Sequence, residues 1–210
     1  MSESKTITVM LVDDHFAVRV GMAASLKFET DIQVVAEAGS GEDAIAIYRE
    51  RQPDVVVMDW RLPGMTGVDA VTEIRKEFPG AKIMMLSVYE GEEDVFKALK
   101  AGASAYVLKS ADREEVLTAI RTVAGGDKYL PPVLAGRMAE RLGRTALTNR
   151  EQGVLELIVE GHSNKEIAAK LGLAEITIKQ HVSNILDKLD VQDRTQAATA
   201  AIQRGIVHLE

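Results

Sequence analysis

The sequence predicts an α/β domain with a doubly wound sheet of five parallel strands, followed by a small all-helical domain. Short apolar runs alternate with amphipathic helical patterns through the first 125 residues. The alternation ends at Gly125-Gly126, and only helical patterns follow. A chain of 210 residues is long enough for two domains that each bury a core. We therefore expect domains at 1–125 and 147–210, joined by a linker at 126–146.

The five predicted strands are rich in Val, Ile and Met, which is typical of strands buried on both faces of a parallel sheet. They lie at 6–11, 33–36, 54–58, 82–86 and 105–108. Helical patterns separate or follow them at about 16–29, 41–51, 66–78, 91–100 and 112–124. Such an order implies right-handed crossovers and helices on both faces of the sheet.

Polar residues stand at the carboxyl ends of four predicted strands. Asp13 and Asp14 follow the first, Asp59 follows the third, and Ser87 and Lys109 end the fourth and fifth. In doubly wound sheets, ligands bind beyond these strand ends, where the strand order reverses. Three crowded carboxylates repel one another unless a cation lies between them, and hard oxygen ligands suit Mg²⁺. An Asp-Asp pair alone is also typical of a solvated turn, but the other strand ends favour a magnesium site.

Residues 7–124 resemble a receiver domain of the CheY kind. Four segments carry the resemblance: LVDDH at 11–15, MDWRLPGMTG at 58–67, LSVY at 86–89 and YVLKS at 106–110. The resemblance implies a flavodoxin-like fold in which Asp59 accepts a phosphoryl group. It also implies that Asp14, Asp59 and the backbone carbonyl of Arg61 bind Mg²⁺ directly, with Asp13 acting through water.

The same resemblance implies roles for three more residues. Lys109 would neutralise charge on the phosphoryl oxygens, Ser87 would donate its hydroxyl to one of them, and Tyr106 would then swing inward. Two positions depart from the common pattern. Ala111 stands where a proline often follows Lys-Ser, so no cis-proline is expected there. Trp60 replaces an aliphatic residue, either as a shield for the site or as a tolerated exposed aromatic.

Helix-start and helix-stop signals organise the last third of the chain. A linker helix is expected from the apolar stripe Leu134, Met138 and Leu142, packed on a domain or paired between protomers. Capping boxes begin at Thr148 and Ser163. Helices are expected at about 149–160, 164–171, 175–189 and 194–204, and the short turn at Gly172 is typical of a helix-turn-helix.

The helix at 175–189 has the pattern of a DNA recognition helix. Ile178, Val182, Ile185 and Leu189 form one apolar stripe, and small polar groups lie opposite, flanked by lysines. An ordinary solvated helix face has the same pattern, so the assignment depends on its surroundings. Amides and hydroxyls can contact base edges, and lysines can contact phosphates.

Residues 147–207 resemble the LuxR-type helix-turn-helix throughout, in LTNRE, GHSNKEIAAKLGL, TIKQHVSNILDKL and RTQAA. By that resemblance Lys179, Gln180 and Ser183 face the major groove, while Lys165, Thr177 and Lys188 approach phosphates. Ala174 replaces the usual Ser or Thr cap of the recognition helix. The two resemblances together are those of the NarL/FixJ family of response regulators. They imply a transcriptional regulator that a sensor histidine kinase phosphorylates, and that binds double-stranded DNA as a homodimer.

Composition excludes several other classes. The absence of cysteine excludes disulfides, thiolate metal sites and a cysteine nucleophile. No apolar run is long enough to span a membrane and no secretory signal is evident, so we expect a cytoplasmic protein with no membrane partner. The helical domain carries 7 Lys/Arg and 9 Asp/Glu, a net of −2, which requires its positive charge to lie on one face.

Three alternatives remain open from the sequence. A phosphatase with an Asp nucleophile would carry a second acid two residues later, where this chain has Arg61, so we expect no turnover enzyme. A receiver-like domain that is never phosphorylated would leave a constitutive DNA-binding protein. An interaction protein whose helical domain dimerises without DNA would show no salt-sensitive binding to duplex DNA.

Overall fold

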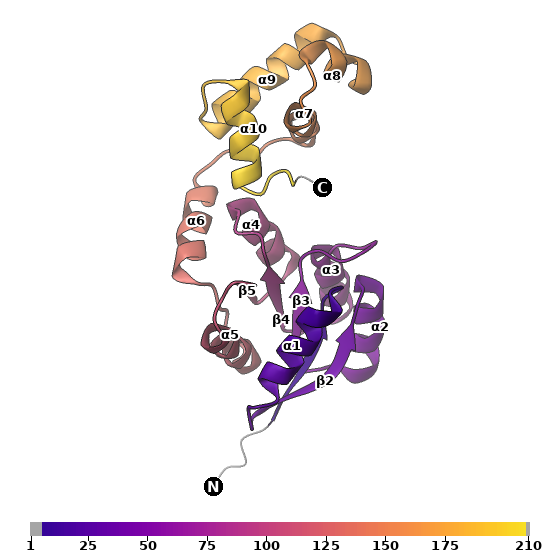
Figure 1. Ribbon diagram of the computed structural model, residues 1–210. Helices are drawn as coiled ribbons and strands as arrows, with labels where there is room; N and C mark the ends of the chain where they lie inside the picture. The colour runs from indigo at the N-terminus through magenta and orange to yellow at the C-terminus, as the bar shows by residue number, and fades with distance from the viewer. Residues whose placement is uncertain (1–5, 209–210) are drawn as a thin grey trace. The chain divides into compact units, whose positions relative to one another are not determined.

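The computed structural model describes residues 6–208 (Figure 1). It contains two compact units. The first comprises residues up to Tyr89 together with Val95–Pro132, and the second comprises Glu90–Asp94 and the residues from Val133 onward. No helix of the described residues is long and apolar enough to cross a membrane.

A five-stranded sheet, parallel throughout, forms the centre of the first unit, with the order β2-β1-β3-β4-β5. The strands are β1 (Ile7–Val12), β2 (Ile32–Ala38), β3 (Val55–Asp59), β4 (Ile83–Ser87) and β5 (Ala105–Leu108). The predicted strands agree with these bounds to within two residues. The order reverses between β1 and β3, which confirms the doubly wound, flavodoxin-like fold.

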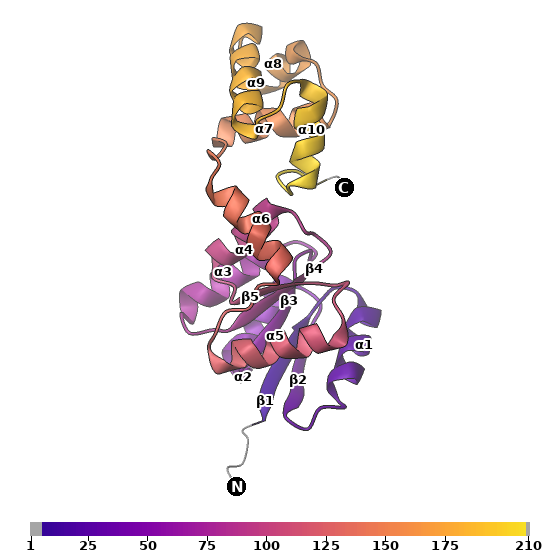
Figure 2. The ribbon, with the colours of Figure 1, turned by 90° about the vertical axis from the view of Figure 1, so that its left-hand side faces the viewer.

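Five helices flank the sheet: α1 (Phe16–Leu26), α2 (Gly41–Arg51), α3 (Gly67–Glu77), α4 (Glu92–Ala101) and α5 (Arg113–Gly125). Helices α1 and α5 lie on one face of the sheet, and α2 and α3 lie on the other (Figure 1). Figure 2 shows α5 lying across its face of the sheet. Neighbouring residues of β1 such as Val9 and Met10 are both completely buried. Because helices cover both faces of the sheet, most residues of these strands are apolar.

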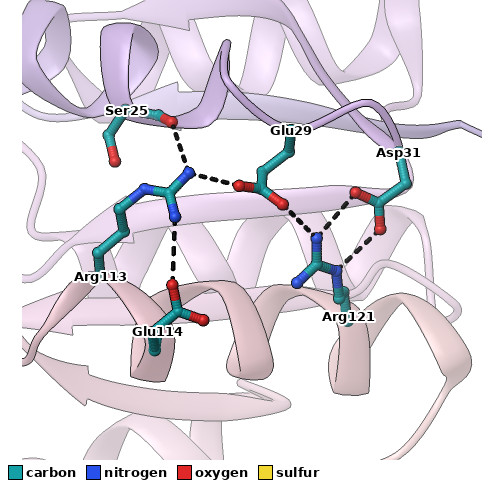
Figure 3. Close-up of polar contacts among 6 residues, drawn as sticks. All are labelled: Ser25, Glu29, Asp31, Arg113, Glu114 and Arg121. Carbon is teal, nitrogen blue, oxygen red and sulfur yellow. Dashed lines mark hydrogen bonds and ion pairs between the residues drawn. The ribbon is translucent and has the colours of Figure 1, made fainter.

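Two arginines of α5 hold the segment between α1 and β2 (Figure 3). Arg121 Nε lies 2.8 Å from Asp31 Oδ2, and Arg121 Nη2 lies 2.6 Å from Glu29 Oε2, while Arg113 also pairs with Glu29. The Arg121 hydrogen bonds hold the pKa values of Glu29 and Asp31 below their ordinary range. Because these groups are partly exposed, water screens the pairs, and their main effect is to fix the position of the segment.

The second unit contains α6 (Pro132–Leu142), α7 (Asn149–Val159), α8 (Asn164–Leu171), α9 (Glu175–Leu189) and α10 (Arg194–Gln203). Both predicted capping boxes are present, from Thr148 to Glu151 and from Ser163 to Glu166. Gly172 ends α8 with a φ of +65°, a conformation that glycine adopts without strain. The core of α7–α10 includes the predicted apolar stripe of α9, with Ile178 and Ile185 completely buried and Val182 partly buried.

Helix α9 starts without a side-chain cap. Its N-cap, Ala174, is exposed and extended, with a φ of −71° and a ψ of 144°, and it offers the first turn no acceptor. We expect Ala174→Ser to raise the free energy of unfolding of this unit by about 1 kcal/mol, because a hydroxyl would accept an orphan backbone N–H. Urea unfolding followed by circular dichroism measures the change. Ala169→Ser, at an exposed position inside α8, is the control and should give no gain; equal effects at both positions would contradict the capping argument.

Candidate functional site

The acidic residues predicted from the strand ends meet at the reversal point of the sheet. Asp13 and Asp14 follow β1, and Asp59 is the last residue of β3. One ligand atom from each of them and from His15 lies within 4.8 Å of the others. Asp13 and Asp59 are each 4% exposed, while Asp14 and His15 face solvent. The cluster therefore has a buried half and an open half.

Lys109 reaches this cluster from the end of β5. Its Nζ lies 2.6 Å from Asp13 Oδ2 and 2.9 Å from Asp59 Oδ2. Burial alone would lower the pKa of Lys109, but its hydrogen bonds to the two carboxylates outweigh burial and hold this pKa above its ordinary value. The ammonium group therefore stays charged between two buried carboxylates.

Burial has the opposite effect on the phosphoacceptor candidate. It raises the pKa of Asp59 above the ordinary value, with a further contribution from the Asp13 charge, and the contact with Lys109 offsets only part of this rise. An Asp with a raised pKa is less stable in its ionised form than an exposed one. A cation beside Asp59 would stabilise the carboxylate that nucleophilic attack requires.

The donor set fits such a cation. The three Asp carboxylates, whose ligand atoms lie within 4.8 Å of one another, are hard oxygen ligands of the kind that Mg²⁺ prefers, and the exposed side of the cluster leaves room for waters. Asp13, Asp14 and Asp59 are the residues that would hold it, with the Arg61 carbonyl as the predicted further ligand.

Ser87 and Tyr106 lie on the neighbouring strands β4 and β5. Ser87 is fully buried, and its hydroxyl accepts a hydrogen bond of 2.9 Å from the Tyr89 backbone N–H. Tyr106 is also fully buried and donates from its hydroxyl to the Tyr89 carbonyl at 2.8 Å. The Trp60 ring lies 6.2 Å from the Tyr106 ring and 6.4 Å from the Tyr89 ring. Tyr106 thus points inward in this structure, against an aromatic group that includes Trp60.

Trp60 is 8% exposed, so the interpretation of an exposed aromatic is wrong. Its partners come from β5 and from the residues after β4, which are remote in sequence. Periodicity offers no signal for that packing.

Two positioning residues were missed from the sequence. Gly67 donates its N–H to the Trp60 carbonyl at 2.9 Å, and a Cβ at Gly67 would lie 1.9 Å from the Asp59 carbonyl oxygen. Arg19, on α1, donates to the Asp13 carbonyl. The turn composition at 62–67 was a signal for Gly67, whereas nothing local marks Arg19.

The six predicted DNA contacts differ in exposure. Lys179, Gln180 and Ser183 are exposed on α9, and Lys165 is exposed on α8. Gln180 Nε2 donates to Asn184 Oδ1 at 3.0 Å, and Lys179 Nζ lies 3.1 Å from Glu175 Oε1. Thr177 is partly buried near the start of α9.

Lys188 forms an ion pair with a buried carboxylate of this unit. Its Nζ lies 2.7 Å from Glu151 Oε2, and Glu151 is 3% exposed and also closes the capping box of α7. Burial would raise the pKa of Glu151, but its hydrogen bonds with Lys188 and Thr148 outweigh burial and hold this pKa below its ordinary value. A phosphate contact by Lys188 would therefore compete with a structural ion pair.

Comparison with known proteins gives two family matches. Residues 9–121 match the response regulator receiver domain, and residues 145–201 match the luxR family of bacterial regulatory proteins. The response regulator protein VraR of Staphylococcus aureus is 41% identical over 207 residues, which cover 96% of this chain and 99% of VraR.

Two solved structures extend the likeness. A LuxR-family two-component response regulator from Aurantimonas is 39% identical, with a TM-score of 0.63 over 66% of this chain and 99% of that one. The response regulator ChrA, of a heme-sensing two-component system, is 36% identical, with a TM-score of 0.57 over 96% of this chain and 99% of that one. The chain therefore belongs to the NarL/FixJ-type response regulators, transcriptional regulators that join a receiver domain to a luxR-type DNA-binding domain.

Proposed function

We propose that this regulator accepts a phosphoryl group on Asp59 from a sensor histidine kinase, and that the phosphorylated form dimerises and binds specific DNA sequences. The pair formed by Asp59 and Lys109 at the reversal point carries the proposal. The domains would be 1–125 for the receiver and 147–210 for DNA binding, with 126–146 as the linker. ChrA supports the kinase partner, because its structure is described as part of a two-component system.

The chemistry is a single in-line displacement. An Asp59 oxygen forms a bond to phosphorus as the bond from phosphorus to the donor nitrogen breaks, and the electron pair leaves with that nitrogen. A bound Mg²⁺ would neutralise charge on the equatorial oxygens. Lys109 supplies a second positive charge to the same oxygens, from a position already set by Asp13. The protein accepts one group and regulates, so no turnover of a separate substrate is required.

The phosphoryl group would change the contacts of two buried residues. The Ser87 hydroxyl would turn to donate to a phosphoryl oxygen, which alters its bond from the Tyr89 N–H. Tyr106 is bonded to the Tyr89 carbonyl, so movement of residues 87–89 reaches the aromatic group. A local charge change would thereby shift the population of receiver conformations.

Recognition of DNA would use the exposed face of α9. Lys179, Gln180 and Ser183 would contact base edges, while Lys165 and Thr177 would approach phosphates. Lys188 would contribute only where DNA competes with Glu151.

Intact mass spectrometry tests the acceptor directly. After incubation with Mg²⁺ and acetyl phosphate, we expect a gain of one phosphoryl group in the wild type and none in Asp59→Asn. Beryllofluoride, followed by the fluorescence of the single tryptophan, Trp60, is the second probe. A Mg²⁺-binding, folded wild type that responds to neither reagent would refute phosphorylation and favour the constitutive DNA-binding alternative.

A further inference from the structure

An apolar side chain stands on the face of α9 that is otherwise polar. Ile176 is 73% exposed, although it belongs to the first turn of the helix. Residues spaced by four and seven share a helix face, which places Ile176 on the same side as Gln180 and Ser183. The buried stripe of α9 runs along the opposite side through Ile178 and Ile185.

Four polar side chains of α9 on or near this face pair with one another. Lys179 pairs with Glu175 at 3.1 Å, and Gln180 donates to Asn184 at 3.0 Å. The two charges of the ion pair offset each other, and the side chains of Gln180 and Asn184 carry no charge. Single exposed isoleucines are common on protein surfaces. Ile176 differs from them because it lies on the face of α9 that is proposed to contact DNA.

The major groove offers one apolar group on its base edges, the C5-methyl of thymine. Helix-turn-helix proteins bring the N-terminal residues of the recognition helix to the base edges. Ile176 is the second residue of α9. Burial against a methyl group would remove its apolar surface from water, whereas a phosphate or a cytosine amino group would gain nothing from it.

We infer that Ile176 determines sequence specificity by packing on the C5-methyl group of a thymine in each half-site. The inference rests on the proposed use of α9 in DNA recognition and adds an apolar contact to the hydrogen bonds proposed for Lys179, Gln180 and Ser183. It predicts that the methyl group, rather than the hydrogen-bonding edge of that base pair, carries the preference. One buried methyl group corresponds to about a fourfold change in affinity.

The experiment begins with the full-length protein, Mg²⁺ and beryllofluoride, and selects duplexes from a randomised pool. In the selected duplex each thymine is replaced singly by deoxyuridine, which removes the methyl group and keeps the hydrogen-bonding edge. Fluorescence anisotropy then gives the affinity of the wild type and of Ile176→Ala for every duplex. We expect one position per half-site where deoxyuridine weakens the wild type about fourfold and leaves Ile176→Ala unchanged.

Ile202→Ala is the matched control, because Ile202 is a 42% exposed isoleucine on α10. It should retain the wild-type response to deoxyuridine. Circular dichroism checks that both variants fold, as their exposure leads us to expect. Equal losses on deoxyuridine in the wild type and Ile176→Ala at every position would overturn the inference, as would an Ile176→Ala affinity equal to that of the wild type. Failure to select any sequence, without salt-sensitive binding to duplex DNA, would instead refute the DNA-binding proposal itself.

Discussion

Lys109→Met slows phosphoryl transfer to Asp59 by about 100- to 1000-fold, the usual effect of removing one group that stabilises transition-state charge. The ammonium group lies 2.9 Å from the carboxylate of Asp59. It would therefore be close to the equatorial oxygens of the phosphoryl group during transfer. Methionine keeps most of the apolar stem of the side chain and removes the ammonium group, with its contacts to Asp13 and Asp59. The rate is measured from the fluorescence of Trp60, which directly follows the acceptor.

The same variant loses stability in the absence of Mg²⁺. Asp13 and Asp59 are both buried and share Lys109 as their cation, so its removal leaves two carboxylates close together without compensation. Breaking a buried ion pair from one side costs about 3 kcal/mol of unfolding free energy. Adding Asp59→Asn to Lys109→Met removes one of the charges and should recover part of the loss. No recovery in the double variant would contradict the charge argument and indicate lost packing instead.

We expect Gly67→Ala to displace Asp59 while leaving the Asp59 carboxylate and Lys109 chemically unchanged. The new Cβ would lie 1.9 Å from the Asp59 carbonyl oxygen, so the backbone between β3 and α3 has to move. We expect a loss of about 3 kcal/mol of unfolding free energy from overpacking. Because a misplacement of about 1 Å can cost 100-fold in rate, phosphorylation should slow by about that factor.

Gly21→Ala is the matched control for this prediction. Gly21 lies inside α1 of the same unit, and a Cβ there would meet nothing within 4 Å. Alanine at an open helical position stabilises by about 0.5–1 kcal/mol. Thermal unfolding should therefore shift in opposite directions for the two variants, with the phosphorylation rate unchanged in Gly21→Ala. A normal rate in a folded Gly67→Ala protein would show that the close approach does not position Asp59.

Local patterns were sufficient to predict the fold and the acidic cluster. The parallel strands are buried on both faces, so their composition marks them, and the carboxyl ends of β1 and β3 must meet at the reversal point. Asp13 and Asp59 could therefore be placed together although 46 residues separate them. The helix starts at Thr148 and Ser163 were predictable for a similar reason, because a capping box spans only four residues.

Contacts between distant elements could not be predicted in this way. Glu151 and Lys188 are 37 residues apart, and their pairing depends on how α7 packs on α9. The inward position of Tyr106 depends on Trp60 and on the Tyr89 carbonyl, which belong to two other segments. Ile176 lies outside the apolar stripe of α9. The periodicity of the helix therefore predicted that Ile176 is not in the core, but it indicated no role for this residue.

The affinity for a selected duplex, measured with and without beryllofluoride in the presence of Mg²⁺, shows whether the state of Asp59 controls DNA binding. Wild-type protein and Asp59→Asn are compared by fluorescence anisotropy at one salt concentration, since affinities for DNA depend on salt. We expect tighter binding by the wild type when beryllofluoride is added, and no response in Asp59→Asn. An affinity that is the same in both conditions for the wild type, or an equal gain in the two proteins, would contradict control of DNA binding through Asp59.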